Sequence, residues 1–378
     1  MDTCDVLVVG GGPAGSACAW RLRQAGLDVV VVDKALFPRD KVCAGWITPQ
    51  VIDELQIDAE DYRRGRTFQP ITGFRVGLIG GAGAVETAYD RPVSFGIRRC
   101  EFDHYLLRRS NARVLTGTPV SSIRRDEGRW VVNETFETAM LVGAGGHFCP
   151  VARLLNGSID RTMLIAAQEV ELPIGARDAS SVGIAGERPE LYFCPDLKGY
   201  GWCFRKENHL NVGFGRLDAR ALPAATAEFV DFLTARHAVP ALGASPWRGH
   251  AYLLSGSSGR CAVADGAMLI GDSAGLAYPQ SGEGIRPAIE SGLMAADTIV
   301  QAQGRYARGR LAPYERAIRR RFGAGPVAEA ISRMLPAGAR TTLAPRLLGI
   351  PWFVRQVALE RWFLHAQEPP LARPPESR

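Results

Sequence analysis

The N-terminal segment constrains the fold of this chain more than any other. A short apolar run at residues 4–9 leads into Gly-Gly-Gly-Pro-Ala-Gly at residues 10–15, which fits the pattern GxGxxG. A helix is expected over residues 14–25, and a run of four valines at 29–32 then ends in Asp33. This order of strand, glycine turn, helix and strand predicts a βαβ unit that binds a dinucleotide. The alternative is a tight glycine turn before a surface helix, with Asp33 as a solvated acid.

Each key position of the glycine turn meets a separate requirement. Gly10 permits the tight turn, Gly12 lets the backbone approach a pyrophosphate, and Gly15 lets the helix pack closely on the strand. Pro13 suits the first turn of a helix. With Ala14 it opens the helix whose N–H groups face the phosphates. These five residues are therefore predicted to contact the cofactor.

The acid at the end of the second predicted strand completes the nucleotide site. Asp33 stands 18 residues after Gly15. At that place it can accept hydrogen bonds from a pair of ribose hydroxyls. Lys34 follows directly and is included among the predicted cofactor contacts.

Composition excludes several classes of protein. Hydrophobic residues make up 46% of the 378 residues and charged residues 22%, which is typical of a globular chain with a buried core. The eight cysteines show no CxxC spacing, so zinc ribbons and iron–sulfur clusters are excluded and no metal site is predicted. Neither a membrane-spanning segment nor a secretory leader is expected, which favours a cytoplasmic protein with reduced thiols.

The positive charge of the chain is concentrated near the C-terminus. The net charge is +6, yet residues 305–361 hold twelve arginines and three glutamates. No recognition motif accompanies this charge, so nucleic acid is not an expected partner. Apolar stretches at 347–354 and 362–364 are interleaved with arginines, a composition suited to the interface of an acidic bilayer. Peripheral membrane contact through this region is one prediction, and a helical cap over the nucleotide domain is the other.

The middle of the chain has a different pattern. Short β-prone runs separated by turn residues predict a mainly antiparallel sheet. They lie at residues 73–78, 190–194, 200–206 and 208–215. A helix at 224–237 is inserted within this sheet. A buried strand at 267–270 and a long helix at 284–303 then return the chain to the nucleotide fold.

A motif in the second half of the chain indicates which dinucleotide is bound. Gly-Asp-Ser-Ala-Gly at residues 271–275 ends the buried strand, and Gly282 and Gly284 lead into the long helix. Here the chain resembles the flavoprotein monooxygenase and reductase superfamily, so FAD is the implied cofactor. The resemblance implies that Asp272 bonds the ribityl chain and that the helix at Gly284 and Ile285 points its N-terminus at the flavin pyrimidine edge. Such an end stabilises the anion formed on reduction. The alternative for Asp272 is a capping acid in a turn.

Two further positions follow from this resemblance. The superfamily carries an arginine before Phe-Asp at the start of a helix, where it reaches the flavin or its pyrophosphate. Arg99 holds that place, and Arg98 is the residue that a shift of one position would select. The superfamily also carries an aspartate in a loop ending Ser-x-x-Arg, and Gly145 stands there in this chain. In the superfamily that aspartate serves both FAD and the nicotinamide donor, so its absence counts against direct use of NAD(P)H. The expected electron donor is therefore NAD(P)H or a protein.

Within the superfamily the chain is most similar to the geranylgeranyl reductase family. Residues 37–47 resemble the Cys-Gly-Gly loop of that family, with Ala44 in place of the first glycine. Residues 199–206 resemble its Tyr-x-Trp-x-Phe-Pro-Lys-Gly strand, with Arg205 in place of proline and Glu207 in place of glycine. The resemblance implies reduction of carbon–carbon double bonds in an isoprenoid or lipid-like small molecule by hydride from flavin N5.

The expected architecture is α/β. A Rossmann-like FAD-binding domain is interrupted by a mainly antiparallel β substrate domain and followed by a helical C-terminal region. The FAD-binding domain is expected to be discontinuous, at residues 1–70, 94–160 and 263–330. The substrate domain is expected at residues 71–93 and 161–262, the helical region at 331–366 and a tail at 367–378.

Three residues are predicted to act on the substrate. Cys43, in the loop near the flavin, is the candidate for giving a proton to the carbon that does not receive hydride. Tyr200 and Trp202 alternate along a predicted strand, so both side chains face one side and would line an apolar tunnel. The alternatives are a small buried cysteine and two ordinary core aromatics.

Two other kinds of protein share the same fold. An FAD-dependent monooxygenase would hydroxylate an aromatic phenol or quinol through a flavin hydroperoxide, with His147 or Tyr200 orienting the ring. An electron-passing flavoprotein is the third class, and the absence of a cysteine cluster counts against it. The sequence leaves the choice between reductase and monooxygenase open.

Overall fold

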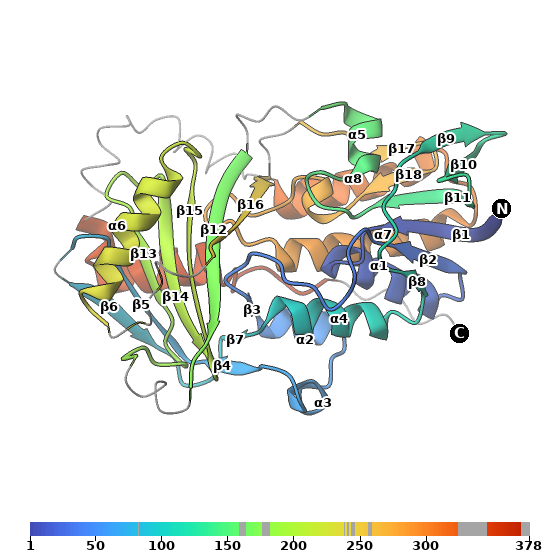
Figure 1. Cartoon of the computed structure of the whole chain (residues 1–378). Helices are drawn as coiled ribbons and strands as arrows, with labels where there is room; N and C mark the ends of the chain where they lie inside the picture. The colour runs from blue at the N-terminus through green and yellow to red at the C-terminus, as the bar shows by residue number, and fades with distance from the viewer. Residues whose placement is uncertain are drawn as a thin grey trace.

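The chain forms two large β-sheets, one on each side of the molecule (Figure 1). This structure, a computed structural model, describes residues 1–81, 83–158, 164–175, 182–237, 239, 242, 246–255, 259–323 and 346–371. The mixed α/β class predicted from the sequence is confirmed. None of the helices in these ranges is both long and apolar enough to cross a membrane.

The first sheet has eight strands and a parallel centre. Its strands are β1 (Asp2–Val9), β2 (Val29–Val32), β8 (Arg113–Leu115), β9 (Ile123–Asp126), β10 (Arg129–Val132), β11 (Phe136–Gly143), β17 (Val263–Ala264) and β18 (Ala267–Leu269). The order along the main path is β17-β18-β11-β1-β2-β8, and β1 pairs in parallel with both β2 and β11. The four valines of β2 are at most 1% exposed. A continuous apolar strand of this kind is typical of a parallel sheet covered on both faces.

Helices from distant parts of the chain lie in the same half of the molecule as this sheet (Figure 1). They are α1 (Pro13–Gln24), α4 (Arg99–Arg109), α5 (Pro150–Asn156), α7 (Ile285–Ala302) and α8 (Arg308–Phe322). The closest crossing joins α1 and α7, because a Cβ added at Gly292 would lie 2.4 Å from the carbonyl oxygen of Ala14. The predicted βαβ unit and the predicted long helix therefore pack directly on each other, as the interrupted architecture requires.

The second sheet has seven strands. They are β5 (Gly73–Leu78), β6 (Ala84–Ala88), β12 (Leu164–Pro173), β13 (Glu190–Phe193), β14 (Gly199–Lys206), β15 (His209–Arg216) and β16 (Arg248–Leu253). The order is β16-β12-β15-β14-β13-β5-β6, and every pair is antiparallel except β13 with β5. The helix α6 (Leu222–Thr234) covers one face, with Phe229 filling the space that Gly201 leaves. The expectation of a mainly antiparallel sheet is confirmed.

A small third sheet lies between the two large ones in the sequence. It consists of β3 (Trp46–Ile47), β4 (Gln69–Ile71) and β7 (Ser94–Gly96), with α2 (Pro49–Glu54) and α3 (Ala59–Arg63) in the connection. Strands of the first large sheet come from residues 2–32, 113–143 and 263–269, and strands of the second from 73–88 and 164–253. We propose on this basis that the domain boundaries lie close to those expected from the sequence.

The C-terminal elements pack on the second sheet. They are α11 (Pro351–Phe353) and η4 (Val354–Phe363), a π-helix. Val354 and Phe363 share a buried apolar cluster with Phe74 of β5 and Trp202 of β14. This apolar face therefore packs on aromatic residues of the substrate sheet. The carbonyl oxygen of His365 accepts a hydrogen bond from Arg286 Nη1 of α7 at 3.1 Å, so the end of the region also contacts the nucleotide domain. Residues 324–345, which include the first part of the predicted helical region, lie outside the described residues.

Candidate functional site

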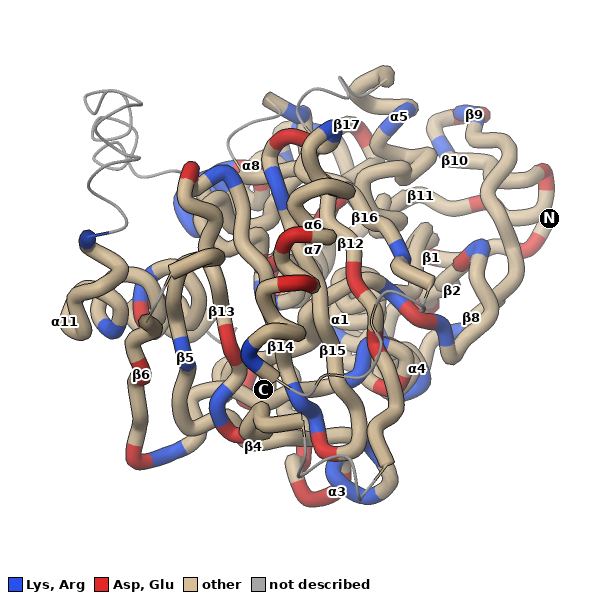
Figure 2. The backbone as a smooth tube through the Cα atoms, turned by 60° about the vertical axis from the view of Figure 1, so that its left-hand side comes forward, with Lys and Arg blue, Asp and Glu red and all other residues tan. Residues whose placement is uncertain are grey.

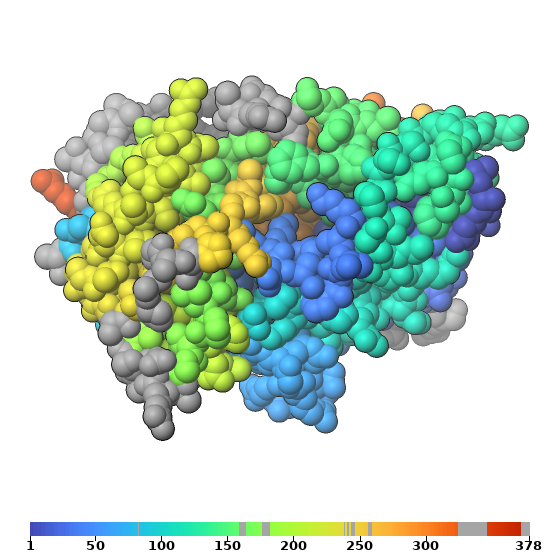
Figure 3. Space-filling model, in the orientation of Figure 1, coloured from blue at the N-terminus to red at the C-terminus, as the bar shows by residue number. Residues whose placement is uncertain are grey.

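A cavity of about 460 Å³ lies where the two large sheets approach each other. It is lined by the glycine turn, the loop before β3, the N-terminus of α7 and one face of the second sheet. In Figure 3 the segments near residue 40 (blue) and residue 250 (gold) meet at the surface beside a hollow. The predicted site residues that line it are Gly10, Gly12, Pro13, Ala14, Asp33, Lys34, Cys43, Arg99, Tyr200, Trp202, Asp272, Gly282, Gly284 and Ile285. Gly15 does not line the cavity.

The glycine turn forms one end of the cavity. Gly10 has φ +117°, and a Cβ there would lie 2.4 Å from the carbonyl oxygen of Ala144, so only glycine fits. A Cβ at Gly15 would lie 1.9 Å from the carbonyl oxygen of Gly10, which makes Gly15 a packing residue. Among the residues that the structure describes, a Cβ at Gly12 would meet only the tip of Arg39 within 4 Å, at 3.3 Å, and no side chain caps α1. The open backbone and the uncapped helix N-terminus fit a pyrophosphate.

Asp33 stabilises the glycine turn through hydrogen bonds with backbone N–H groups. Its two carboxylate oxygens accept hydrogen bonds from the backbone N–H groups of Gly11, at 2.7 Å, and Ala35, at 2.8 Å. A carboxylate has about four lone-pair positions, so acceptor capacity remains for ribose hydroxyls. Lys34 lines the cavity beside it.

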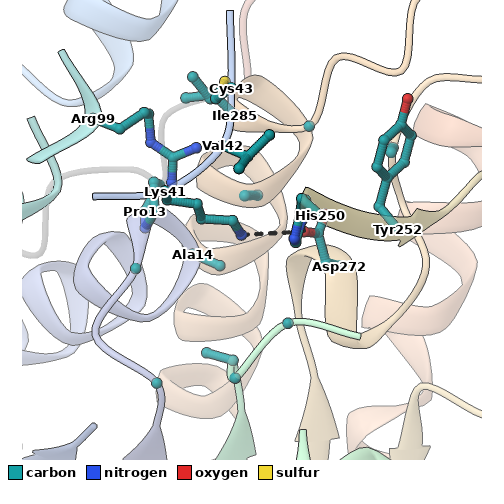
Figure 4. A pocket seen from close by; sticks show the side chains of 18 of the residues that line it. Pro13, Ala14, Lys41, Val42, Cys43, Arg99, His250, Tyr252, Asp272 and Ile285 are labelled. Atoms are coloured by element: carbon teal, nitrogen blue, oxygen red, sulfur yellow. Dashed lines mark hydrogen bonds and ion pairs between the residues drawn. The ribbon is translucent and has the colours of Figure 1, made fainter. Parts of the chain in front are cut away.

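Asp272 lies at the centre of a charged group on the opposite wall. It belongs to the 3-10 helix η3 (Gly271–Ser273) that follows β18. One oxygen, Oδ2, lies 3.5 Å from Lys41 Nζ and 3.8 Å from His250 Nε2. Figure 4 shows Lys41 reaching across toward Asp272. Burial alone would raise the pKa of Asp272, but Lys41 and His250 hold that pKa well below its usual value.

His147 lies behind this group with an unused ring nitrogen. Its ring centroid is 5.3 Å from that of His250, and within the described residues its buried Nε2 has no hydrogen-bond partner. Burial, with His250 nearby, lowers the pKa of His147 to about 4. Both histidines are therefore neutral at physiological pH, because burial also lowers the pKa of His250. The neighbours of His147, Gly146 and Phe148, line the cavity and His147 itself does not, so the structure does not place the predicted ring-orienting histidine against a ligand.

The N-terminus of α7 is less open than the sequence suggested. Gly282 has φ +67°, and a Cβ there would lie 2.2 Å from the hydroxyl oxygen of Tyr252. Glu283 folds back and accepts the backbone N–H of Arg286 at 2.8 Å. Burial raises the pKa of Glu283 to about 7. The helix end that would face the flavin therefore carries a titratable carboxyl, which the sequence analysis did not single out.

Cys43 and Arg99 meet beside the glycine turn. The Arg99 guanidinium donates two hydrogen bonds of 2.8 Å to Asp103, and Cys43 lies close enough to act on its charge. Burial opposes the charge on Arg99, but Asp103 and Cys43 raise its pKa above the usual value. Arg98, the alternative position, turns away to Glu171 instead, 3.1 Å from its Nε. Of these two arginines, Arg99 is thus the one that lines the cavity (Figure 4), and its bonds to Asp103 fix its orientation.

Aromatic side chains form the far wall. Tyr200 donates its hydroxyl to the carbonyl oxygen of Ser281, and Trp202 donates Nε1–H to Asn211 Oδ1 at 2.7 Å. Their ring centroids lie 5.9 Å apart, and both rings line the cavity. Gly213 leaves the space that the indole of Trp202 occupies, because a Cβ there would lie 2.1 Å from the ring. Polar edges are satisfied while apolar faces remain available, an arrangement suited to an apolar ligand.

The sequence analysis missed several residues of the site, among them Lys41, His250, Tyr252 and Glu283. Lys41 had a visible signal, since the chain contains only four lysines and this one stands in the loop of Cys43. Glu283 also stood between two predicted glycines. His250 and Tyr252 had none, because β16 was not predicted and a strand gives no indication of which distant loop it faces.

Comparison with known proteins gives a consistent result. The family model for FAD dependent oxidoreductases matches residues 5–77. The chain is 32% identical over 327 residues to a menaquinone reductase of Mycobacterium tuberculosis, covering 79% of this chain and 77% of that protein. It is 31% identical over 325 residues to the chloroplastic geranylgeranyl diphosphate reductase of Oryza sativa subsp. japonica, covering 78% and 66%. The crystal structure of a geranylgeranyl bacteriochlorophyll reductase-like protein from Thermoplasma acidophilum has a TM-score of 0.76 at 23% identity, over 94% of this chain and 93% of that one.

The fold, the glycine turn and these relatives together define an FAD-dependent oxidoreductase. FAD is its cofactor, as the sequence predicted. The chain belongs to the geranylgeranyl reductase family.

Proposed function

We propose that this enzyme reduces carbon–carbon double bonds in an isoprenoid or other lipid-like substrate. The observation that carries the proposal is that Cys43 lines the same cavity as the glycine turn and the aromatic wall. Bound and reduced FAD supplies hydride at N5. Cys43 supplies the proton that the second carbon of the double bond requires.

The residues assigned to FAD divide along the cavity. Gly10, Gly12 and the N-terminus of α1 would hold the pyrophosphate, with Pro13 and Ala14 opening that helix. The other assigned residues also line the cavity: Asp33 and Lys34 would contact the ribose, Asp272 with Lys41 the ribityl chain, Arg99 the flavin, and Gly282, Gly284 and Ile285 its far end. Gly15 supports this set from behind by allowing α1 to approach the turn.

The far wall supports a lipid-like substrate. Trp46, Leu191, Tyr200 and Trp202 line the cavity on this side, and Trp46 stacks on Phe204 with ring centroids 4.9 Å apart. Such a wall excludes water from a hydrocarbon chain and stabilises it by burial, by roughly 0.8 kcal/mol for each CH₂. The names of two relatives, a menaquinone reductase and a geranylgeranyl diphosphate reductase, support a substrate with a prenyl chain.

We further propose that electrons arrive either from NAD(P)H or from a protein donor. The protein donor is proposed because Gly145 offers no side chain to a nicotinamide.

Contact with a membrane surface is proposed for the segment around α11, where Ile350 is 45% and Trp352 67% exposed. Figure 2 shows basic positions on either side of α11. Trp352→Ser should reduce co-sedimentation with acidic phospholipid vesicles, and equal binding of both proteins would remove the membrane contact.

The proposed reaction is tested with the FAD-loaded protein under anaerobic conditions. Reduced with dithionite and mixed with geranylgeranyl diphosphate or a menaquinone, the enzyme should reoxidise and release a product two hydrogen atoms heavier in its prenyl chain, with the ring of menaquinone returned to the quinone by air before the mass is measured. Cys43→Ser should slow this step roughly 100-fold with unchanged flavin content, whereas Cys261→Ser, a half-buried cysteine elsewhere, should not. Failure of every prenylated acceptor, together with hydroxylation of phenols in air, would select the monooxygenase instead.

A further inference from the structure

A second cavity, of about 180 Å³, lies behind the loop that carries Cys43. It shares Lys41, Cys43 and Arg99 with the large cavity, so Cys43 has one side toward each. The exposed rim is closed by an ion pair between Arg248 Nη1 and Asp40 Oδ2, 2.5 Å apart, with the two side chains 61% and 50% exposed. The second cavity therefore reaches from the protein surface to the candidate proton donor without passing through the large cavity.

Two glutamates of β12 project into this second cavity. Glu169 and Glu171 lie two residues apart on one strand and so share a face. Glu171 is paired with Lys206 Nζ at 3.0 Å and with Arg98 Nε at 3.1 Å. Figure 2 shows acidic and basic positions gathered where β12 meets the N-terminal part of the molecule.

Glu169 has neutral partners instead. It is 7% exposed, and within the described residues it forms no ion pair. Its Oε2 accepts the backbone N–H of Cys43 at 2.6 Å and the side-chain amide of Asn211 at 3.4 Å. Glu171 is thus paired with two cations, whereas Glu169 accepts a hydrogen bond from the backbone N–H of Cys43.

These different surroundings shift the pKa values of Glu169 and Glu171 in opposite directions. Burial raises the pKa of Glu169 to about 7, although Lys206 acts against this. Burial has the same tendency at Glu171, but Lys206 and Arg98 lower the pKa of that group below its usual value. The other charged groups that line this cavity are Asp40 and Lys41 in the loop that carries Cys43, Arg98 and Arg99 at the start of α4, and Arg248 on β16. Paired acids with separated pKa values mark a proton-carrying group and a fixed charge.

We infer that the second cavity is the proton-entry route to Cys43, and that Glu169 reloads the cysteine from solvent. This inference rests on the proposed double-bond reduction. Glu169 does not touch the substrate, so it is a positioning and relay residue that acts through Cys43.

Reduction of each double bond consumes one proton from Cys43, and Glu169 replaces that proton. Cys43 loses its S–H proton to the substrate carbon as hydride reaches the other carbon, which leaves a thiolate. The O–H bond of Glu169 then breaks and the S–H bond forms again, through water in the second cavity. A water needs only about 10–15 Å³ of accessible space, so a polar cavity of 180 Å³ can hold such a chain. Solvent entering between Asp40 and Arg248 returns the proton to Glu169.

The first test is the pH profile of substrate-driven flavin reoxidation. In the wild type the rate should fall as pH rises through about 7, because Glu169 then loses its proton. Glu169→Gln should lack this inflection and react on the order of tenfold more slowly at pH 6. Glu171→Gln is the matched control and should keep the inflection whatever its rate. An inflection retained in Glu169→Gln, or lost equally in both variants, would overturn the relay.

The second test does not depend on turnover. Iodoacetamide should alkylate Cys43 in the FAD-loaded protein through the second cavity, as followed by mass spectrometry of the Cys43 peptide. Arg248→Ala removes the ion pair at the rim and should raise this rate several-fold. Arg188→Ala, which removes a comparable exposed pair with Glu86 on the same sheet, should leave it unchanged. An equal rate in Arg248→Ala and wild type would contradict the route.

The two tests also separate the inference from the proposed function. A wild-type enzyme that reduces no prenylated acceptor refutes the function, while the alkylation rates still decide whether Cys43 is reached from behind. A wild type that reduces the acceptor, with identical pH profiles in both glutamine variants, refutes the relay alone.

Discussion

The two ends of the large cavity are built in different ways. The phosphate end is one continuous stretch, from β1 through the glycine turn to Asp33, and the backbone makes most of it. The substrate end is assembled from the loop before β3, from α4, and from β12, β14 and β16, all through side chains. A backbone site is specified by local spacing, whereas a side-chain site depends on how distant segments meet.

The strongest way to break this comparison is to add a side chain in the glycine turn. Gly15→Val would place its Cβ 1.9 Å from the carbonyl oxygen of Gly10 and force the backbone apart. We expect a loss of stability above about 4 kcal/mol together with loss of bound flavin. Gly309→Ala in α8, where a Cβ meets none of the described residues within 4 Å, should be neutral or slightly stabilising. Thermal denaturation and flavin absorbance measure both, and a flavin-loaded Gly15→Val protein would refute this packing role.

The matching change at the substrate end should spare the flavin. Gly213→Ala would place a Cβ 2.1 Å from the indole of Trp202 and displace that ring from the wall. Turnover of a prenylated acceptor should fall on the order of 10- to 100-fold, because small displacements at a reacting site are costly. Gly215→Ala on the same strand, with its nearest contact at 3.7 Å, is the control. Equal kinetics in the two variants would show that the position of Trp202 is unimportant.

This contrast explains how much could be predicted from the sequence. The strand, turn, helix and acid at residues 4–33 were predicted because each has a local cause, such as the positive φ of Gly10. The antiparallel character of the second sheet was also predicted from alternation and turns. The pairing of Lys41 with Asp272 was not, since these residues are far apart in the chain and nothing local records their contact. The same is true of Glu169, because β12 was not recognised as a strand.

A smaller effect is expected from a substitution at Asp272, which lies between the phosphate end and the substrate end of the large cavity. Asp272→Asn removes the charge that faces Lys41 while preserving shape. Flavin affinity should fall roughly tenfold, which corresponds to about 1.4 kcal/mol. Asp196→Asn, which breaks a 2.6 Å pair with Arg216 on the second sheet, should not change it. Fluorescence titration of each apoprotein with FAD gives the comparison, and equal affinities would remove Asp272 from the cofactor site.

The smallest expected effect concerns the C-terminal segment, which contacts both regions. Glu54 Oε1 accepts the backbone N–H of Leu371 at 3.2 Å, and burial, with Glu290 nearby, raises the pKa of Glu54 to about 7. A raised carboxyl pKa stabilises the folded state at low pH, and this contribution is lost as pH rises through 7. Glu54→Gln should therefore raise the unfolding free energy at pH 8, by about 2 kcal/mol at most, and change it little at pH 5. Exposed Glu60→Gln is the control, and equal effects at both pH values would contradict the assignment.

The central claim is that the chemistry at the substrate end is reduction. The most direct measurement is the mass of the product after a single turnover of reduced, FAD-loaded enzyme mixed with a prenylated quinone in air-saturated buffer. The account predicts a product heavier by two hydrogen atoms, with oxygen acting only as a competing oxidant of the flavin. A product heavier by one oxygen atom would contradict it and identify a monooxygenase.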